Sequence, residues 1–114
     1  GESNLWSTEH MRRQVERAQQ IQRERFAGSG ICYNSQIPPG EIAVYCKTSE
    51  GAEKMLQGAF ESLHLSGRAC NRILRVARTA ADLDGKERIE EEEIAEAIGY
   101  RSFDKHSWKQ GDKL

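Results

Sequence analysis

The sequence has few aromatic residues, few prolines and no long apolar run. Of its 114 residues, 7% are aromatic and 2 are proline. No apolar stretch approaches the roughly 18 residues that a membrane-spanning helix requires, and no signal peptide is visible. Hydrophobic residues make up 37% of the chain and charged residues 31%. This balance predicts one small domain with a modest core, exposed charged helices and no membrane contact.

Cysteine and net charge are also scarce. The three cysteines, Cys32, Cys46 and Cys70, form no CxxC pair, and their odd number predicts reduced thiols and a cytoplasmic location. The cysteines and histidines match no zinc-ligand spacing, so we expect no metal site. The formal net charge is −1, from 17 basic and 18 acidic residues. Such a balance excludes a strong overall attraction to nucleic acid.

The parts of a self-sufficient nucleotide-hydrolysing enzyme are missing. There is no GxxxxGK[ST] phosphate loop, and the GSG at residues 28–30 has neither that ending nor a preceding apolar strand. No apolar strand ends in Asp-Glu to hold Mg²⁺, and no alternation of strands predicts a nucleotide-binding sheet. We therefore expect that this chain alone does not hydrolyse ATP. Because it begins with Gly rather than Met, we expect it to be a piece of a longer protein.

What the sequence contains is helical periodicity, which predicts an all-α fold, a small bundle of four to five helices. We expect residues 1–6 to be disordered or appended, residues 7–103 to form the domain, and residues 104–114 to be a flexible tail. Residues 27–40 are rich in Gly and Pro and predict a loop. The predicted helices run from Ser7 or Thr8 to about Phe26, over one or two turns within 41–46, from Thr48 or Ser49 to about Leu63, over about 67–83, and over about 90–98.

Apolar residues at helical spacing indicate the core, and charged residues between them indicate the exposed faces. The first helix has a narrow apolar stripe that depends on packing against neighbours, namely Met11, Val15, Ala18 and Phe26. The helix that ends near Leu63 has a broader set that we expect to be buried, namely Met55, Leu56, Ala59, Phe60 and Leu63. In the last helix we expect most glutamates to point outward, namely Glu91, Glu92, Glu93 and Glu96.

The helix over 67–83 has the clearest division between two faces. Ser66 is suited to cap its first turn, and Gly85 to end it in a left-handed conformation. Arg68, Arg72 and Arg75 follow at i, i+4 and i+7, within roughly 40° of one another and away from the apolar side. An arginine in a first turn is ordinarily part of a solvated face. Arg68, however, lies beside the positive end of the helix dipole, which costs about 0.3–1 kcal/mol and suggests an anion that it meets.

Several motifs occur in order around this helix. They are the LSGRA entry at 65–69 (with Ser66 and Arg68), the body RILRVARTAADLDG at 72–85, and the end ERIEEEEIAEAIGYRS at 87–102. Together with RRQVERAQQIQRERF at 12–26 and Asn34, they resemble the end of the magnesium-chelatase-related AAA+ ATPases of the YifB/ComM type. The resemblance covers roughly residues 8–103.

This resemblance implies that the domain is the small helical lid of an ATPase. In such proteins the arginine that opens the lid helix, called sensor 2, reaches the phosphates of ATP bound mostly by a larger domain. That role falls on Arg68, and Arg72 and Arg75 are further candidates for contact with the nucleotide. The resemblance also implies ATP and Mg²⁺ in the longer protein, an upstream large domain, neighbouring subunits in a ring, and, for some members, work on DNA; distant members insert metal.

One alternative remains from the residues themselves. Basic residues gather in 12–25 and 68–78, and acidic residues in 90–96. The two basic helices could form a stand-alone module that binds DNA or a protein partner. Salt-dependent DNA binding by this domain would favour that interpretation over the lid.

Overall fold

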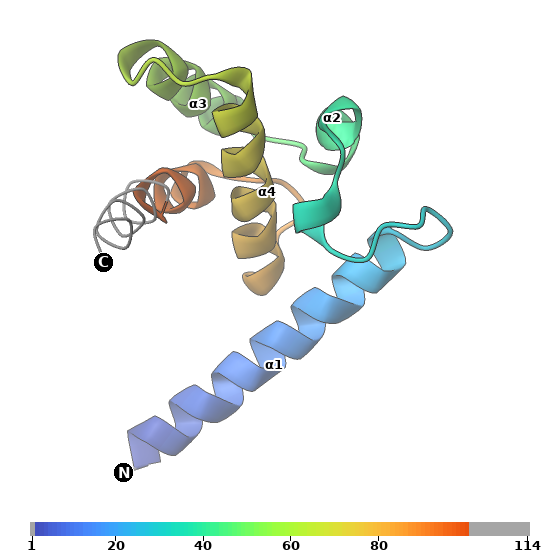
Figure 1. The fold of residues 1–114 in the computed structure, drawn as a ribbon. Coiled ribbons are helices and arrows are strands. Elements are labelled where there is room, and N and C mark those ends of the chain that lie inside the picture. Colours follow the sequence, from blue (N-terminus) through green and yellow to red (C-terminus); the bar gives the residue numbers. More distant parts are fainter. Residues whose placement is uncertain (1, 101–114) are drawn as a thin grey trace, which may run out of the picture.

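The computed structural model describes residues 2–100 of the chain, with side chains from residue 8 onward, and is all-α (Figure 1). The predicted fold class is confirmed. The helices are α1 (Glu2–Arg25), two short 3₁₀ turns η1 (Asn34–Gln36) and η2 (Pro39–Glu41), α2 (Ile42–Tyr45), α3 (Glu50–Ser62), α4 (Gly67–Leu83) and a last helix over 91–100. In the part of the chain that is described, extended pairing is limited to an isolated bridge between Thr48 and Ile89. None of the described helices is long and apolar enough to cross a membrane.

Helix α4 lies at the centre of the domain. Figure 1 shows α3 and α2 on either side of its N-terminal half, while α1 crosses its C-terminal end. At that crossing, Gln14 Nε2 and Arg17 Nη2 of α1 donate to the Leu83 carbonyl at 3.4 and 3.3 Å, which satisfies an otherwise unpaired helix-end acceptor. The core is formed by apolar side chains from α2, α3, α4, the last helix and the segments between the helices, including Phe26, Ile37, Ile42, Ala52, Leu65, Ile73, Ala77, Ala81, Ile89 and Ile94.

The predicted helix ends of α3 and α4 are confirmed by their caps. Ser49 Oγ accepts from the Ala52 N–H, and Ser66 Oγ accepts from the Ala69 N–H, each at 3.1 Å. At the end of α4, Gly85 has a φ of 71°. The Lys86 and Gly85 N–H groups donate back to the Ala81 and Asp82 carbonyls at 2.9 and 3.0 Å. This pair of backbone hydrogen bonds requires a residue in the left-handed conformation, which Gly adopts readily.

Helix α1 begins earlier than predicted. It starts at Glu2 rather than at Ser7 or Thr8. Neither Ser7 nor Thr8 is needed as a cap, because nothing in 2–6 breaks the helix. The predicted tail, residues 104–114, lies outside the described residues.

Two parts of the predicted burial are wrong. Phe60 and Leu63 are 46% and 50% exposed, because α3 packs through its N-terminal part, where Ala52 is fully buried, and its last turn extends past the core. Glu93, expected to point outward, is fully buried. Its carboxylate accepts from the Glu90 N–H and from Lys86 Nζ, both at 2.8 Å, and so caps the first turn of the last helix.

Candidate functional site

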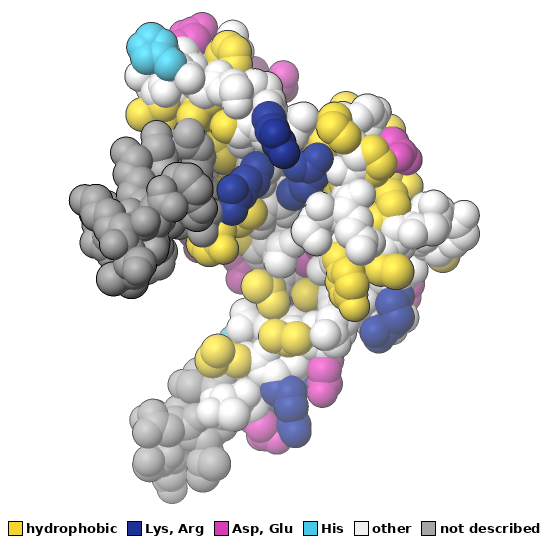
Figure 2. Space-filling model, in the orientation of Figure 1, with side chains coloured by type: hydrophobic (Ala, Val, Ile, Leu, Met, Phe, Trp, Pro, Cys, Tyr) yellow, Lys and Arg dark blue, Asp and Glu magenta, His cyan; other side chains and the backbone are white. Residues whose placement is uncertain are grey.

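The arginine row of α4, defined as Arg68, Arg72 and Arg75, begins at the N-terminal end of the helix. Arg68 lies in the first turn, beside the Ser66 cap, and its side chain is exposed. Within residues 8–100 it makes no hydrogen bond or ion pair. In the space-filling view, dark blue side chains gather where α4 passes between α3 and α2 (Figure 2). The guanidinium of Arg68 is therefore directed to solvent from the end of a capped helix.

The other two members of the row differ from each other. Arg72 is exposed one turn after Arg68. Arg75 is half-buried, and its Nε donates to the Ile37 carbonyl at 2.9 Å. Arg75 therefore holds the segment after η1 against α4, a structural role that its spacing alone did not reveal. Its outward orientation, predicted from the helical wheel, is correct only in part.

Arg78, which follows Arg75 on α4, belongs to the interior. It is 1% exposed. Its Nη1 and Nη2 donate to the Glu87 and Lys86 carbonyls at 2.7 and 2.6 Å, and its Nε donates to Asp82 Oδ1 at 3.1 Å. Burial lowers the pKa of Arg78 from its ordinary value, and the Asp82 carboxylate opposes that shift. The guanidinium fork fastens the turn after α4 to the helix itself.

Asp82 is the centre of a buried polar cluster, defined as Arg25, Asn34, Arg78 and Asp82. Its carboxylate is fully buried and accepts from Arg25 Nη1 and Nη2 at 2.8 and 2.6 Å, and from Asn34 Nδ2 at 2.8 Å. Asn34 Oδ1 also accepts from Arg25 at 2.9 Å. Among the described residues, no buried side-chain polar atom lacks a partner. The cluster therefore joins α1, η1 and α4 through a fully satisfied network.

The sequence alone does not reveal that these four residues form one cluster. Arg25 and Asp82 are 57 residues apart, and no local pattern connects them. The local sign was the i, i+4 spacing of Arg78 and Asp82, which favours an ion pair on one helix.

The buried cysteine and the lysine after α4 stabilise the fold and do not form a reactive site. Burial raises the pKa of the Cys46 thiol to about 11, which keeps it protonated and unreactive at neutral pH. The hydrogen bonds that Lys86 Nζ donates to the Glu92 and Glu93 carboxylates raise the pKa of Lys86. In the described part of the chain, no three His, Cys, Asp or Glu side chains are grouped so that they could hold a metal ion.

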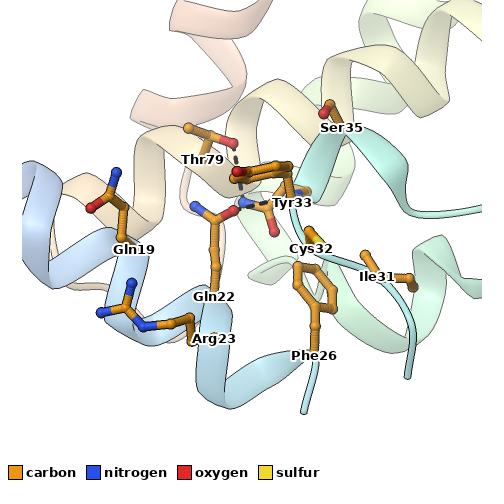
Figure 3. Close-up of a pocket in the computed structure, with 10 residues that line it drawn as sticks. Gln19, Gln22, Arg23, Phe26, Ile31, Cys32, Tyr33, Ser35 and Thr79 are labelled. Atoms are coloured by element: carbon orange, nitrogen blue, oxygen red, sulfur yellow. Dashed lines mark hydrogen bonds between the residues drawn. The ribbon is translucent and has the colours of Figure 1, made fainter. Parts of the chain in front are cut away.

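A pocket of about 690 Å³ lies where α1, the 29–36 segment and α4 meet (Figure 3). Phe26 lies at its base and is 3% exposed, and Tyr33 at its rim is 61% exposed. In Figure 3, Gln19, Gln22 and Arg23 come from α1, while Thr79 comes from α4 and lies near the Tyr33 ring. The residues that line the pocket include no aspartate or glutamate.

The sequence of this chain matches one known protein family over most of its length. The profile of the family described as "Magnesium chelatase, subunit ChlI C-terminal" matches residues 6–101, which is most of the sequence. The chain belongs to this family. The match begins at residue 6, within α1, and extends through the last described helix, so nearly all of the bundle corresponds to one family domain.

Individual relatives agree with this membership. The chain is 39% identical to the competence protein ComM of Haemophilus influenzae over 93 residues, which covers 82% of this chain and 18% of that protein. It is 38% identical to the uncharacterized protein YifB of Escherichia coli K12 over 72 residues, which covers 63% of this chain and 14% of the relative. The chain therefore spans less than a fifth of the length of these relatives. No solved structure matches it.

Proposed function

We propose that this domain is the lid of a magnesium-chelatase-like AAA+ ATPase, and that it closes over ATP bound by an upstream domain of the same polypeptide. In this proposal Arg68 acts as the sensor-2 arginine and contacts the ATP phosphates. Arg72 lies one turn further along and extends the positive surface toward the nucleotide, while Arg75 contributes its remaining guanidinium nitrogens. The protein works in the cytoplasm as a ring of such subunits.

The exposure of Arg68 is the observation that supports this proposal. Arg75 and Arg78 lie on the same helix, and both use their guanidinium groups to hold the domain together. Arg68 has no such use within the described residues, and its position at the positive end of the helix dipole is unfavourable until an anion approaches. A side chain kept in that position is suited to a ligand outside the domain.

The chemistry of guanidinium fits a phosphate ligand. Arginine stays charged and offers a planar fork of donors that matches phosphate oxygens. In phosphoryl transfer, the protein mainly positions groups and stabilises charge, so a single well-placed cation has a large effect on rate. A cation carried on a separate domain also couples the bound nucleotide to the angle between the domains.

Mg²⁺ in this proposal is held by the upstream domain rather than by the lid. Carboxylates are the side chains that Mg²⁺ prefers, and the described residues offer no such cluster. The arginine row fits the phosphates of ATP and repels a divalent cation. The lid therefore supplies charge to the nucleotide, and the metal enters from the other side of the interface.

The test is an Arg68→Ala substitution in the full-length ATPase. We expect ATP turnover to fall by about 10²-fold, the loss typical when one charge-stabilising donor is removed. Arg13→Ala is the control, because Arg13 is an exposed arginine on α1 outside the row. Unchanged turnover in Arg68→Ala would remove Arg68 from the mechanism.

The stand-alone binding module predicts a different result. It requires several free arginines on α4, whereas Arg75 is partly and Arg78 wholly engaged inside the domain. If the lid proposal holds, the domain binds duplex DNA no more tightly than a neutral protein does, even at low salt. Binding that weakens steeply as salt rises would favour the module instead.

A further inference from the structure

The face of α4 that carries the arginine row continues past Arg75 to the pocket of Figure 3. Thr79 follows Arg75 by one turn on the same face of α4, and it lines the pocket. The 11 residues from Arg68 to Thr79 correspond to roughly 16 Å along the helix axis. Arg68 and the pocket therefore lie at the two ends of one face of the domain.

Helix α1 continues this face on the other side of the pocket. Val15, Gln19, Gln22 and Phe26 follow one another at spacings of three and four residues, so they lie along one side of the helix. Val15 and the neighbouring Met11 are 44% and 61% exposed. Figure 2 shows apolar side chains along α1 on the same side of the molecule as the dark blue cluster of α4. One side of α1 thus presents exposed apolar side chains at Met11 and Val15 and then amide side chains at Gln19 and Gln22, which line the pocket.

The lining of the pocket is suited to a polypeptide segment with an apolar side chain. Phe26 and Ile31 give it an apolar wall, and exposed Tyr33 adds a ring at the rim. Within the described residues, the side-chain amide nitrogens of Gln19 and Gln22 donate no hydrogen bond, so both can donate to backbone carbonyls. With no carboxylate in the lining, carbonyl oxygens are not repelled.

We propose that this face, made of Met11, Val15 and the pocket, binds a segment of the upstream ATPase domain of the same polypeptide. The inference rests on the proposed function, since it requires that domain. The matched part is less than a fifth of the relatives' length, and the family is described as C-terminal, so the larger part of such a protein precedes α1. In such a protein the preceding chain joins α1 at Glu2, on the same helix as Met11 and nine residues before it. Tethering gives that neighbour a high effective concentration at this face, which a separate partner lacks.

The buried polar cluster connects this contact to the position of Arg68. Arg25, at the end of α1, binds Asp82 in the last turn of α4 with two hydrogen bonds, so α1 and α4 move as one body. A segment seated in the pocket then fixes the position of α4 and of Arg68 at its far end. Docking at the pocket sets how closely Arg68 approaches the nucleotide.

Cys32 provides a native reporter for the test. It is exposed and lines the pocket, so a seated segment shields its thiol. The rate of iodoacetamide labelling at Cys32 is measured by peptide mass spectrometry in the full-length protein with a non-hydrolysable ATP analogue. We expect labelling at least tenfold slower than in the urea-unfolded protein. Gln19→Asp places a charge in the contact and restores fast labelling. Arg13→Asp, at an exposed position roughly 150° around α1 from the side that faces the pocket, leaves labelling slow.

Three outcomes overturn the inference. Cys32 labels as fast in the native protein as in the unfolded one, or Gln19→Asp and Arg13→Asp label alike, or protection disappears on dilution, which would assign the face to a second copy. The Arg68→Ala variant keeps the two proposals separate. If it loses turnover while Cys32 stays fully reactive in wild type, the proposed function stands and this inference falls. If turnover is unchanged while Cys32 is protected, the reverse holds.

Discussion

The two ends of α4 use the same kind of side chain for opposite purposes. At the C-terminal end, Arg78 is 1% exposed, and all three kinds of guanidinium nitrogen have partners inside the domain. At the N-terminal end, Arg68 is exposed and makes no hydrogen bond or ion pair to another described residue. The two residues lie on one helix, 10 positions apart in the sequence. Burial and pairing, rather than residue type, distinguish the arginine that builds the domain from the exposed one that we propose contacts a nucleotide.

The largest effect is expected at the buried end, from Asp82→Asn. This change keeps the shape of the side chain but removes the charge that compensates Arg25 and Arg78. Breaking a buried ion pair in this way costs about 3–5 kcal/mol of unfolding free energy. Urea denaturation of the two proteins measures the loss.

Asp84→Asn is the matched control, because Asp84 is exposed two residues later. It is expected to change stability by less than about 0.5 kcal/mol. Equal effects of the two substitutions would contradict the structural role of the cluster.

A second effect is expected from pH, at Cys46 in the core beside the buried arginines. The folded thiol has its pKa raised from 9.0 to about 11 by burial, although the positive charges of Arg78, Arg25 and Arg75 oppose the shift. Above pH 9 the unfolded chain loses this proton while the folded chain keeps it, so this stability is present below pH 9 and is lost as the pH rises to 11. The loss amounts to about 2–3 kcal/mol, at about 1.4 kcal/mol for each unit of pKa.

Urea denaturation across this pH range measures the effect. In Cys46→Ala this part of the pH dependence disappears, although the variant is less stable throughout. Parallel pH curves for wild type and variant would show that the thiol titrates normally in the fold.

What the sequence could predict about these two ends depends on the distance over which each interaction acts. The bounds of α4 and its caps at Ser66 and Gly85 follow from residues next to one another, and they were predicted correctly. The contact of Arg25 with Asp82 joins residues 57 positions apart, and only the folded chain brings them together. The exposure of Phe60 was missed for a related reason, since helical spacing identifies an apolar face but not how far the neighbouring helix extends along it.

Glu93 illustrates an intermediate case. Its contact with the Glu90 N–H is local, three residues back in the chain. The usual signature places Ser or Thr at the first of these positions, and Glu90 replaces it here. A run of four glutamates looks like a solvated surface. Lys86, which precedes the helix, pairs with exposed Glu92 as well as with buried Glu93, so this ion pair alone does not identify the glutamate that turns inward.

A smaller effect is expected at the exposed end, from Ser66→Ala. Removing the hydroxyl leaves the Ala69 N–H without its acceptor and costs about 1 kcal/mol of unfolding free energy. Thermal denaturation monitored by circular dichroism measures the shift. Ser62→Ala is the control, because Ser62 is exposed in the last turn of α3. A loss as large as that of Asp82→Asn would mean that the first turn of α4 carries more of the fold than its exposure implies.

The most direct test measures stability and activity together for Arg68→Ala in the full-length protein that we propose to be an ATPase. The account predicts an unfolding free energy within about 0.5 kcal/mol of wild type, because an exposed side chain without internal partners is lost. It predicts at the same time that ATP turnover falls by about 10²-fold. A variant that unfolds more easily, or one that turns over ATP at the wild-type rate, would contradict the claim that Arg68 is held outside the domain for a nucleotide.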